Sequence, residues 1–176
     1  MIETPRLLLR RWQDRDRAPF AAMGADAEVM AHFPALLSRA EGDAMVDRMA
    51  AMMADQGFGF WAVERRDTGG FIGFCGLNRV NFPCPVEGEV EIGWRLARTA
   101  WGQGFAREAA QACLDWGADH GLARIVSFTV PANVRSWGLM ERLAMRRRAD
   151  LDFDHPRLAD DSPLKRHIVY VASRPE

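Results

Sequence analysis

The sequence predicts an α/β fold, and three observations lead to this prediction. The chain has 176 residues with 48% hydrophobic content, which is enough for one sizeable core. Segments that alternate apolar and polar residues, as half-buried strands do, are interleaved with segments of helical periodicity. Glycine or proline stands at several boundaries between these segments. We therefore expect a single domain over residues 1–176 with the element order β-α-α-β-β-β-α-β-α-β-β.

The first half of the chain is expected to hold a strand, two helices and a β-hairpin. A stripe of methionines at helical spacing, ended by Gly57, indicates the second helix, and this stripe is expected to lie in the core. The turn sequence Asp67-Thr68-Gly69-Gly70 between two alternating segments is typical of a hairpin. In chain order we expect a strand over residues 5–12, helices over 14–24 and 38–56, and strands over 58–66 and 71–80.

Strands and helices alternate in the second half. Apolar residues at every second position predict a half-buried strand over residues 89–96, and Gly121 stands where a glycine would end the following helix. In chain order we expect a strand over 89–96, a helix over 103–120, a strand over 123–130, a helix over 133–143, and final strands over 149–153 and 167–172.

Composition and charge exclude several classes of partner. The 23 Lys and Arg residues against 24 Asp and Glu give a net charge of −1, so no overall field attracts nucleic acid or an anionic membrane. No apolar run approaches the roughly 20 residues that cross a bilayer, and we expect a soluble, cytoplasmic protein. Three cysteines without a CxxC pair and four histidines without ligand spacing predict neither a disulfide scaffold nor a metal site.

The stretch WGQGFAREA, residues 101–109, places two glycines where a helix begins. The first amides of a helix are unpaired and lie at the positive end of its dipole, so glycines there let a phosphate approach the backbone. A dinucleotide fingerprint would need a glycine at Arg107, and a P-loop would need GxxxxGK, which is absent. A tight turn without a ligand remains the alternative interpretation.

The surrounding motifs resemble a known family. EIGWRL (residues 91–96), WGQGFAREA and TVPANVRSWGLMERLAM (residues 129–145) follow in the order and spacing of the GCN5-related N-acetyltransferases (GNAT), and the ends TPRLLLR and PLKRHIVY resemble their RimJ/RimL-like branch. The resemblance implies a mixed, mostly antiparallel central sheet with splayed central strands and helices on both faces. It also implies acetyl-CoA as cosubstrate, and direct transfer of its acetyl group to a primary amine in a ternary complex.

The same resemblance assigns the residues that bind acetyl-CoA. Backbone amides of the glycine turn would hold the diphosphate, the strand backbone would bind the pantetheine arm, and Asn133 would face the cofactor or serve only as a helix N-cap. Gly93 in that strand would mark a bulge or a close backbone approach. The residues implied are Trp94, Leu96, Trp101, Gly102, Gln103, Gly104, Phe105, Ala106, Arg107 and Asn133.

The catalytic residues implied are Glu91 and Ser136. Attack by an amine requires loss of a proton, and Glu91 matches the family's E-I-G-Y/W glutamate, so it is the expected general base. We expect Glu87 and Glu89 to share its side of the strand and to raise its pKa by repulsion, although the three could also form a plain exposed acidic face. Met140 stands where many members carry a tyrosine acid, so Ser136 would assist the thiolate, or the thiolate would leave unaided.

The acceptor cannot be read from the sequence beyond its class, a small-molecule amine or a protein N-terminus. Loops over residues 82–86 and 154–161 are expected to shape its site, with Phe82, Glu89 and His155 as candidate contacts. Six tryptophans are compatible with a homodimer. Two other hypotheses remain at this stage: a catalytically weak acyl-CoA-binding regulatory module of the same fold, and an unrelated phosphate-binding protein with a chance GxG.

Overall fold

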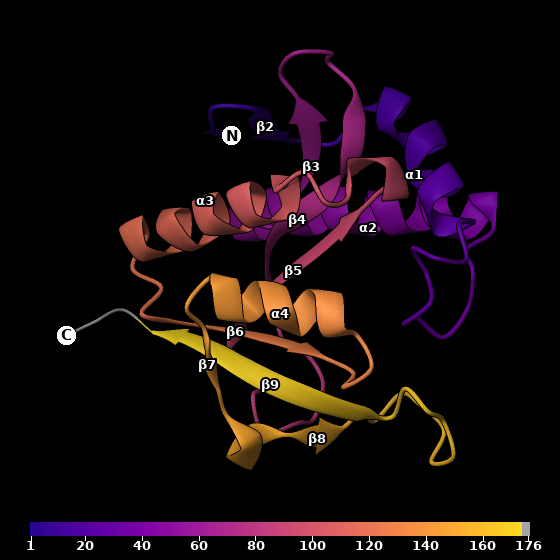
Figure 1. Ribbon diagram of the computed structural model, residues 1–176. Coiled ribbons are helices and arrows are strands. Elements are labelled where there is room, and N and C mark those ends of the chain that lie inside the picture. The colour runs from indigo at the N-terminus through magenta and orange to yellow at the C-terminus, as the bar shows by residue number, and fades with distance from the viewer. Residues whose placement is uncertain (174–176) are drawn as a thin grey trace.

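The computed structural model describes residues 1–173 and shows an open, nine-stranded sheet (Figure 1). The strand order is β1-β2-β3-β4-β5-β6-β9-β7, with β8 paired to β9. All pairs are antiparallel except β5 and β6, so the expected mixed, mostly antiparallel sheet is confirmed. The strands are β1 (Ile2–Glu3), β2 (Leu7–Arg10), β3 (Phe60–Arg65), β4 (Phe71–Arg79), β5 (Val90–Leu96), β6 (Arg124–Thr129), β7 (Arg146–Arg147), β8 (Phe153–Asp154) and β9 (Arg166–Ser173).

Helices cover both faces of this sheet, as expected. They are α1 (Arg17–Gly24), α2 (Arg39–Gln56), α3 (Phe105–Asp119) and α4 (Val134–Arg142), with short 3₁₀ turns at Asp14–Asp16, Arg98–Ala100 and Ala149–Leu151. Residues of α3 and α4 pack with Cys75 and Ile92 on one face, which we call the α3 face. Helices α1 and α2 pack with Phe74 on the opposite face, where Glu91, Gly93 and Arg95 of β5 also lie. We call that side the Glu91 face.

The two central strands separate after a short contact. Strands β5 and β6 pair only at Val90 with Ile125 and at Glu91 with Val126. Beyond that point β5 pairs only with β4, and β6 pairs only with β9. The Ser127 hydroxyl of β6 donates a hydrogen bond to the Ile92 carbonyl oxygen of β5 at 2.9 Å. The expected splay is therefore present, as a fork that opens between β5 and β6.

Local turn and capping signals placed the long elements correctly. Ser38 and Glu41 form a reciprocal capping box at the start of α2, and Gly57 ends that helix with a φ of 75°. The predicted hairpin is present, with Gly69 in the left-handed region and β3 paired antiparallel to β4. Gly121 follows α3 with a φ of 80°, as a C-terminal glycine should.

Some predicted boundaries were wrong. Residues 149–153 do not form one strand, because a 3₁₀ turn is followed by the two-residue β8. The first strand covers only Leu7–Arg10, and the strand expected over 89–96 begins at Val90, so Glu89 lies outside it. Gly93 causes no bulge: its register with β4 is continuous, and the glycine instead admits the Phe60 ring, which a Cβ would meet at 3.1 Å.

Ala144 adopts a conformation that favours glycine. Its φ is 58°, and it is the second residue after the end of α4. Because the left-handed region costs an L-residue about 1–2 kcal/mol, we expect Ala144→Gly to raise the free energy of unfolding by about 1 kcal/mol and Tm by about 2–4 °C. The matched control is Ala50→Gly in the exposed interior of α2, which should lower the free energy of unfolding by about 1 kcal/mol. A fall in Tm for both variants in calorimetry would contradict the strain at Ala144.

Candidate active site

The glycine turn before α3 presents unpaired backbone amides. Gly102 and Gly104 have φ values of 72° and 80°, and Gly104 is the N-cap of α3. Within residues 1–173, nothing accepts a hydrogen bond from the backbone N–H groups of residues 102–107. Exposed glycines leave this row of donors open to solvent at the positive end of the helix dipole, which is the geometry of an anion site.

Side chains of the turn hold its shape rather than reach outward. The Trp101 indole N–H donates to the Leu96 carbonyl oxygen at 2.8 Å, and the Gln103 amide donates to the Thr99 carbonyl oxygen at 2.8 Å. The Phe105 ring is buried. Arg107 is exposed. Any anion would therefore be bound by the backbone, with the arginines Arg6 and Arg107 at the same turn.

The N-terminus braces this turn from the far end of the sequence. Arg6 donates through Nη1 to the Gln103 carbonyl oxygen at 2.9 Å and pairs through Nε with Glu108 at 2.6 Å. The Thr4 hydroxyl donates to the same carboxylate at 2.6 Å. No pattern in the sequence indicates this brace, because its partners lie about a hundred positions apart and share no local motif.

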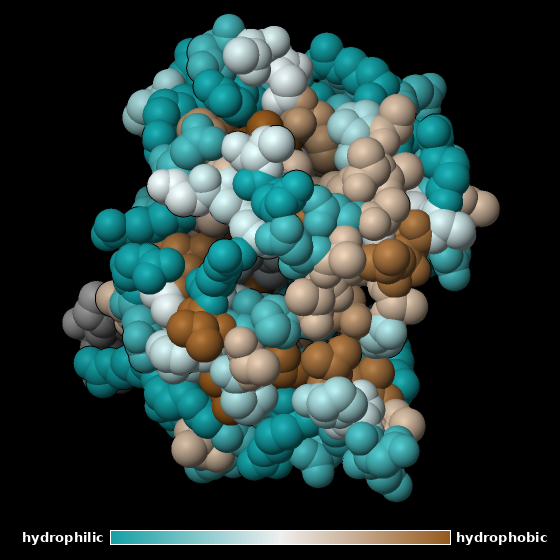
Figure 2. Space-filling view, turned by 45° about the vertical axis from the view of Figure 1, so that its right-hand side comes forward, coloured by the Kyte–Doolittle hydropathy of each residue, from teal (hydrophilic) through white to brown (hydrophobic). Residues whose placement is uncertain are grey.

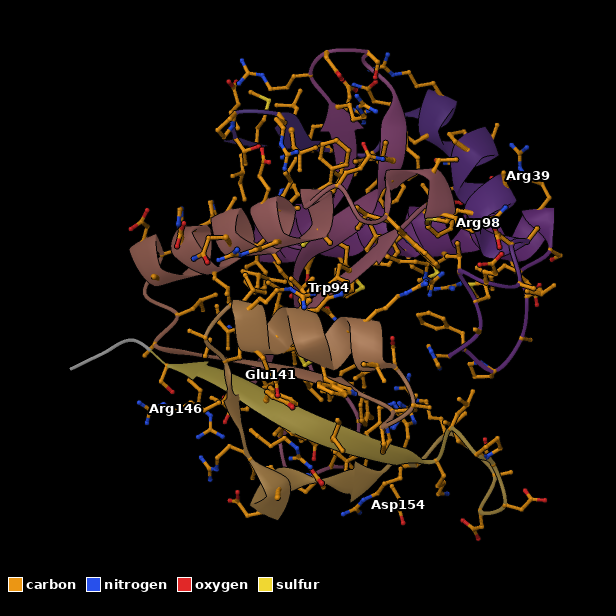
Figure 3. The ribbon with its side chains drawn as sticks, in the orientation of Figure 1. Arg39, Trp94, Arg98, Glu141, Arg146 and Asp154 are labelled. Carbon is orange, nitrogen blue, oxygen red and sulfur yellow. The ribbon has the colours of Figure 1, made fainter. Side chains whose placement is uncertain are left out.

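The fork lies next to the turn and leaves strand backbone without a neighbour. The carbonyl oxygens of Ile92 and Leu96 face the fork. They accept hydrogen bonds from the Ser127 hydroxyl and the Trp101 indole N–H, respectively. Since backbone groups alternate sides along a strand, the amide of Trp94 faces the fork as well. Figure 3 shows Trp94 in the space between α3 and α4. An extended ligand arm could pair here as an added strand.

Glu91 has an unusual environment on the other face. Its carboxyl group accepts a hydrogen bond from the Asn78 side-chain amide at 3.4 Å. Burial raises the pKa of Glu91 to about 7, although this hydrogen bond acts to lower that pKa. The raised pKa was expected, but the expected cause was wrong. Glu87 and Glu89 precede β5, and Glu89 pairs with Arg124 at 3.2 Å, so repulsion within a shared strand face is not the source.

The start of α4 faces the same fork. Asn133 caps the helix by accepting from the Ser136 N–H at 3.3 Å, and its amide donates to the Thr129 hydroxyl at 3.0 Å. The Ser136 hydroxyl is half-buried and bonds to no other residue in the part of the chain described. Met140 is 1% exposed within the core, so it does not offer a group to the fork. The only tyrosine, Tyr170, donates instead to Glu141, which points from α4 toward β9 (Figure 3).

Phe82 and His155, from the two loops expected to shape the acceptor site, are in contact. Their rings lie 4.6 Å apart, and the backbone N–H of His155 donates to the Lys165 carbonyl oxygen at 2.8 Å. Phe82 packs against the cluster that contains Val126, the neighbour of Glu91 in the sheet, which places this pair on the Glu91 face. Burial, and then His167, lower the pKa of His155, so its ring is neutral at pH 7.

A shallow hollow of about 340 Å³ lies between the α1–α2 connection and the start of α4. Figure 2 shows apolar residues gathered across the middle of the molecule, between its upper and lower halves. The α1–α2 connection has no periodicity or motif in the sequence that would have indicated this hollow. The lining residues of the hollow are Glu28, Ala31, His32, Ala132, Val134 and Arg135.

Two negative findings apply to the part of the chain that the structure describes. Over residues 1–173, no helix is long and apolar enough to cross a membrane. The same residues contain no group of three or more His, Cys, Asp or Glu side chains that could hold a metal ion.

The forked sheet and the glycine turn before α3 define an acetyltransferase fold. The chain belongs to the family of the acetyltransferase (GNAT) domain, which matches residues 6–146. The protein YkkB of Bacillus subtilis is 32% identical over 148 residues, covering 82% of this chain and 84% of YkkB.

Solved structures share the fold over almost the whole chain. The GNAT-family acetyltransferase of Bacillus anthracis superposes with a TM-score of 0.81 at 22% identity, covering 98% of this chain and 97% of that one. RimL, a ribosomal-protein acetyltransferase solved in complex with coenzyme A, superposes with a TM-score of 0.76 at 15% identity, covering 97% and 95% of the two chains. At these identities the two structures show the fold alone.

Proposed function

We propose that this protein is an N-acetyltransferase that transfers the acetyl group of acetyl-CoA to a primary amine in a ternary complex. The observation that carries the proposal is the juxtaposition of the unpaired amides of residues 102–107 with the fork side of β5, which has no partner strand beyond Glu91. A diphosphate with an extended arm fits this pair. RimL, which shares the fold, was solved with coenzyme A bound.

The backbone provides most of the proposed binding site for acetyl-CoA. Amides of the turn from Gly102 to Arg107 hold the diphosphate, and the backbone of Trp94 and Leu96 binds the pantetheine arm. Trp101 and Asn133 act by keeping the turn and the α4 start in place, since their side chains already bond to Leu96 and Thr129. These residues bind and orient the thioester at the fork.

Glu91 is the proposed general base. The amine nitrogen attacks the thioester carbonyl carbon, the carbon–sulfur bond breaks, and the proton of the amine passes to Glu91, through a water where the distance requires it. A carboxyl group with a pKa of about 7 is well matched to this task near neutral pH. Because Glu91 lies on the face opposite α3, the amine approaches from the Glu91 face while acetyl-CoA lies along the fork.

Ser136 is the proposed hydrogen-bond donor that stabilises the departing thiolate, which then takes its proton from solvent. Ser136→Ala should lower kcat about ten- to a hundredfold and leave the Kd for acetyl-CoA unchanged, because the hydroxyl acts only on the leaving sulfur. Alanine is a stronger helix former than serine, so α4 should remain intact, which thermal unfolding checks. Normal turnover in this variant would mean that the thiolate leaves unaided.

The function is tested by measuring free CoA release with acetyl-CoA and a panel of amines, namely amino acids, polyamines, aminoglycosides and short peptides. We expect CoA release that depends on one class of amine, together with thermal stabilisation by acetyl-CoA alone. Stabilisation without turnover on any amine would instead support a regulatory module that binds acyl-CoA. The absence of both would contradict the proposal.

A further inference from the structure

Arg95 is a buried arginine without an anionic partner. It is 7% exposed, and its Nε and Nη1 atoms are buried without a hydrogen-bond acceptor. Burial alone lowers its pKa to about 10, so it remains charged at pH 7. A buried charge without a partner is costly, and such a group is retained where something else compensates it.

Arg10 shows how this chain otherwise treats a buried arginine. It is 6% exposed, which is as buried as Arg95. Its guanidinium bonds to both oxygens of Asp16, at 2.7 and 2.8 Å, and to Glu64 at 2.7 Å. No carboxylate within residues 1–173 does the same for Arg95. The missing anion is therefore specific to Arg95 and not a general property of this core.

Aromatic rings hold the Arg95 guanidinium in place. Its central carbon lies 3.9 Å from the Phe33 ring centroid and 5.5 Å from that of Phe74. Such cation–π contacts stabilise the charge but leave the in-plane N–H donors free. Phe74 is buried, whereas Phe33 is 37% exposed and belongs to the α1–α2 connection, so Phe33 covers the guanidinium on the solvent side.

The position of Arg95 relates it to the proposed base. Arg95 and Glu91 are four residues apart on the same face of β5, a separation of about 13 Å between their Cα atoms. Gly93 stands between them, with the Phe60 ring over it. An apolar surface therefore separates the carboxyl group from the guanidinium. The residues next to Phe33, Ala31 and His32, line the hollow at the surface.

We propose that Arg95 binds a carboxylate carried by the amine acceptor, and so selects acceptors that bear an acid group as well as the amine. This inference rests on the proposed function, because it concerns the acceptor of the same site. Guanidinium and carboxylate pair in a planar, bidentate way, which suits the free donors of Arg95. The acceptor reaches Arg95 by displacing the Phe33 ring. The phosphates of acetyl-CoA are not the anion, since their proposed site lies at the start of α3.

Binding is measured first, independently of turnover. The probes are glycine, β-alanine and γ-aminobutyrate, each beside its primary amide, titrated calorimetrically into protein saturated with CoA. We expect at least one acid to bind about tenfold or more tightly than its amide, as hydrogen bonds to a charged group allow. In Arg95→Met this preference should vanish, and Arg95→Lys should retain part of it. Equal binding of every acid and its amide by the wild type would overturn the inference.

Kinetics with acetyl-CoA then separate specificity from structure. For the preferred acid, Arg95→Met should raise KM about ten- to a hundredfold, with kcat and the Kd for acetyl-CoA changed less than about twofold. KM for the amide should not change. The matched control is Arg98→Met, an exposed arginine three positions along that pairs with Glu28 at 2.7 Å (Figure 3), and it should keep the wild-type preference.

Thermal unfolding of Arg95→Met tests whether Arg95 has a purely structural role. Removing a buried, unpartnered charge should leave the Tm of ligand-free Arg95→Met unchanged or raise it. A lowered Tm together with equal loss of acid and amide binding would show that Arg95 only packs, and would overturn the inference. Acid binding that depends on Arg95 without turnover of any amine would contradict the N-acetyltransferase function and leave the carboxylate site standing.

Discussion

Glu91→Gln should reduce kcat about tenfold to a thousandfold while acetyl-CoA binds with its normal Kd. Glutamine keeps the shape of the side chain and its contact with Asn78 but cannot take a proton, and general base catalysis contributes on the order of 10²–10⁴-fold. The effect should appear in kcat and kcat/KM equally, because the interaction is made in the transition state.

The pH profile makes this test specific. Burial places the pKa of Glu91 at about 7, so the carboxyl is protonated and inactive below that pH and is an active base above it. kcat/KM of the wild type should therefore rise with pH through about 7, and the limb due to this group should be missing in Glu91→Gln. An unchanged profile would assign the proton to water.

Glu87→Gln is the matched control for the base. Glu87 is an exposed carboxylate in the turn before β5. The substitution makes the same chemical change as Glu91→Gln, four residues upstream. It should keep the wild-type rate and profile. Equal losses in the two variants would indicate a general effect of acidic charge on a cationic acceptor, and would contradict a specific role for Glu91.

Gly104→Val should raise the Kd for acetyl-CoA about ten- to a hundredfold, the equivalent of one or two charge-assisted hydrogen bonds. Two physical reasons combine. A branched side chain beside the amides obstructs the diphosphate, and a φ of 80° is unfavourable for valine, so the turn shifts and the row of donors is lost. Isothermal titration of acetyl-CoA measures the effect directly.

Gly121→Val controls for the backbone strain. Gly121 has the same φ of 80°, is exposed, and lies at the opposite end of α3, with no atom within 4 Å of an added Cβ. Both variants should lose a similar amount of thermal stability, and only Gly104→Val should lose affinity. If Gly104→Val folds and binds acetyl-CoA normally, the turn is not the diphosphate site.

Local patterns predicted the long elements, and the resemblance to the GNAT family predicted the fork between the central strands. The hairpin at residues 67–70 followed from turn residues that tolerate left-handed geometry, and α2 followed from its periodicity and terminal glycine. Strands β1 and β7 were missed because each has two residues, too few to show alternation, and the equally short β8 begins only at the last residue of the strand expected over 149–153. Turn and helix preferences of individual residues could be predicted from the sequence. The pairing of short edge strands could not, because it depends on the rest of the sheet.

Long-range packing explains what the sequence could not show at the candidate site. The raised pKa of Glu91 comes from burial among segments that fold together only in three dimensions, so repulsion between sequence neighbours was the wrong cause. Arg95 looked like an ordinary polar position of a half-buried strand. It stands out only when Phe33 and Phe74 are seen around it and Arg10 is seen with its two acids.

The division of the sheet into two faces has a consequence for how such a protein can change over evolutionary time. On the proposed assignment, the groups that bind acetyl-CoA are backbone atoms of the turn and the fork, which most substitutions leave in place. On the same assignment, the acceptor would be contacted by side chains on the Glu91 face and by three connecting segments, which are residues 25–38, 80–89 and 155–165. Substitutions in these segments can therefore replace one amine by another while the backbone site for acetyl-CoA is inherited intact.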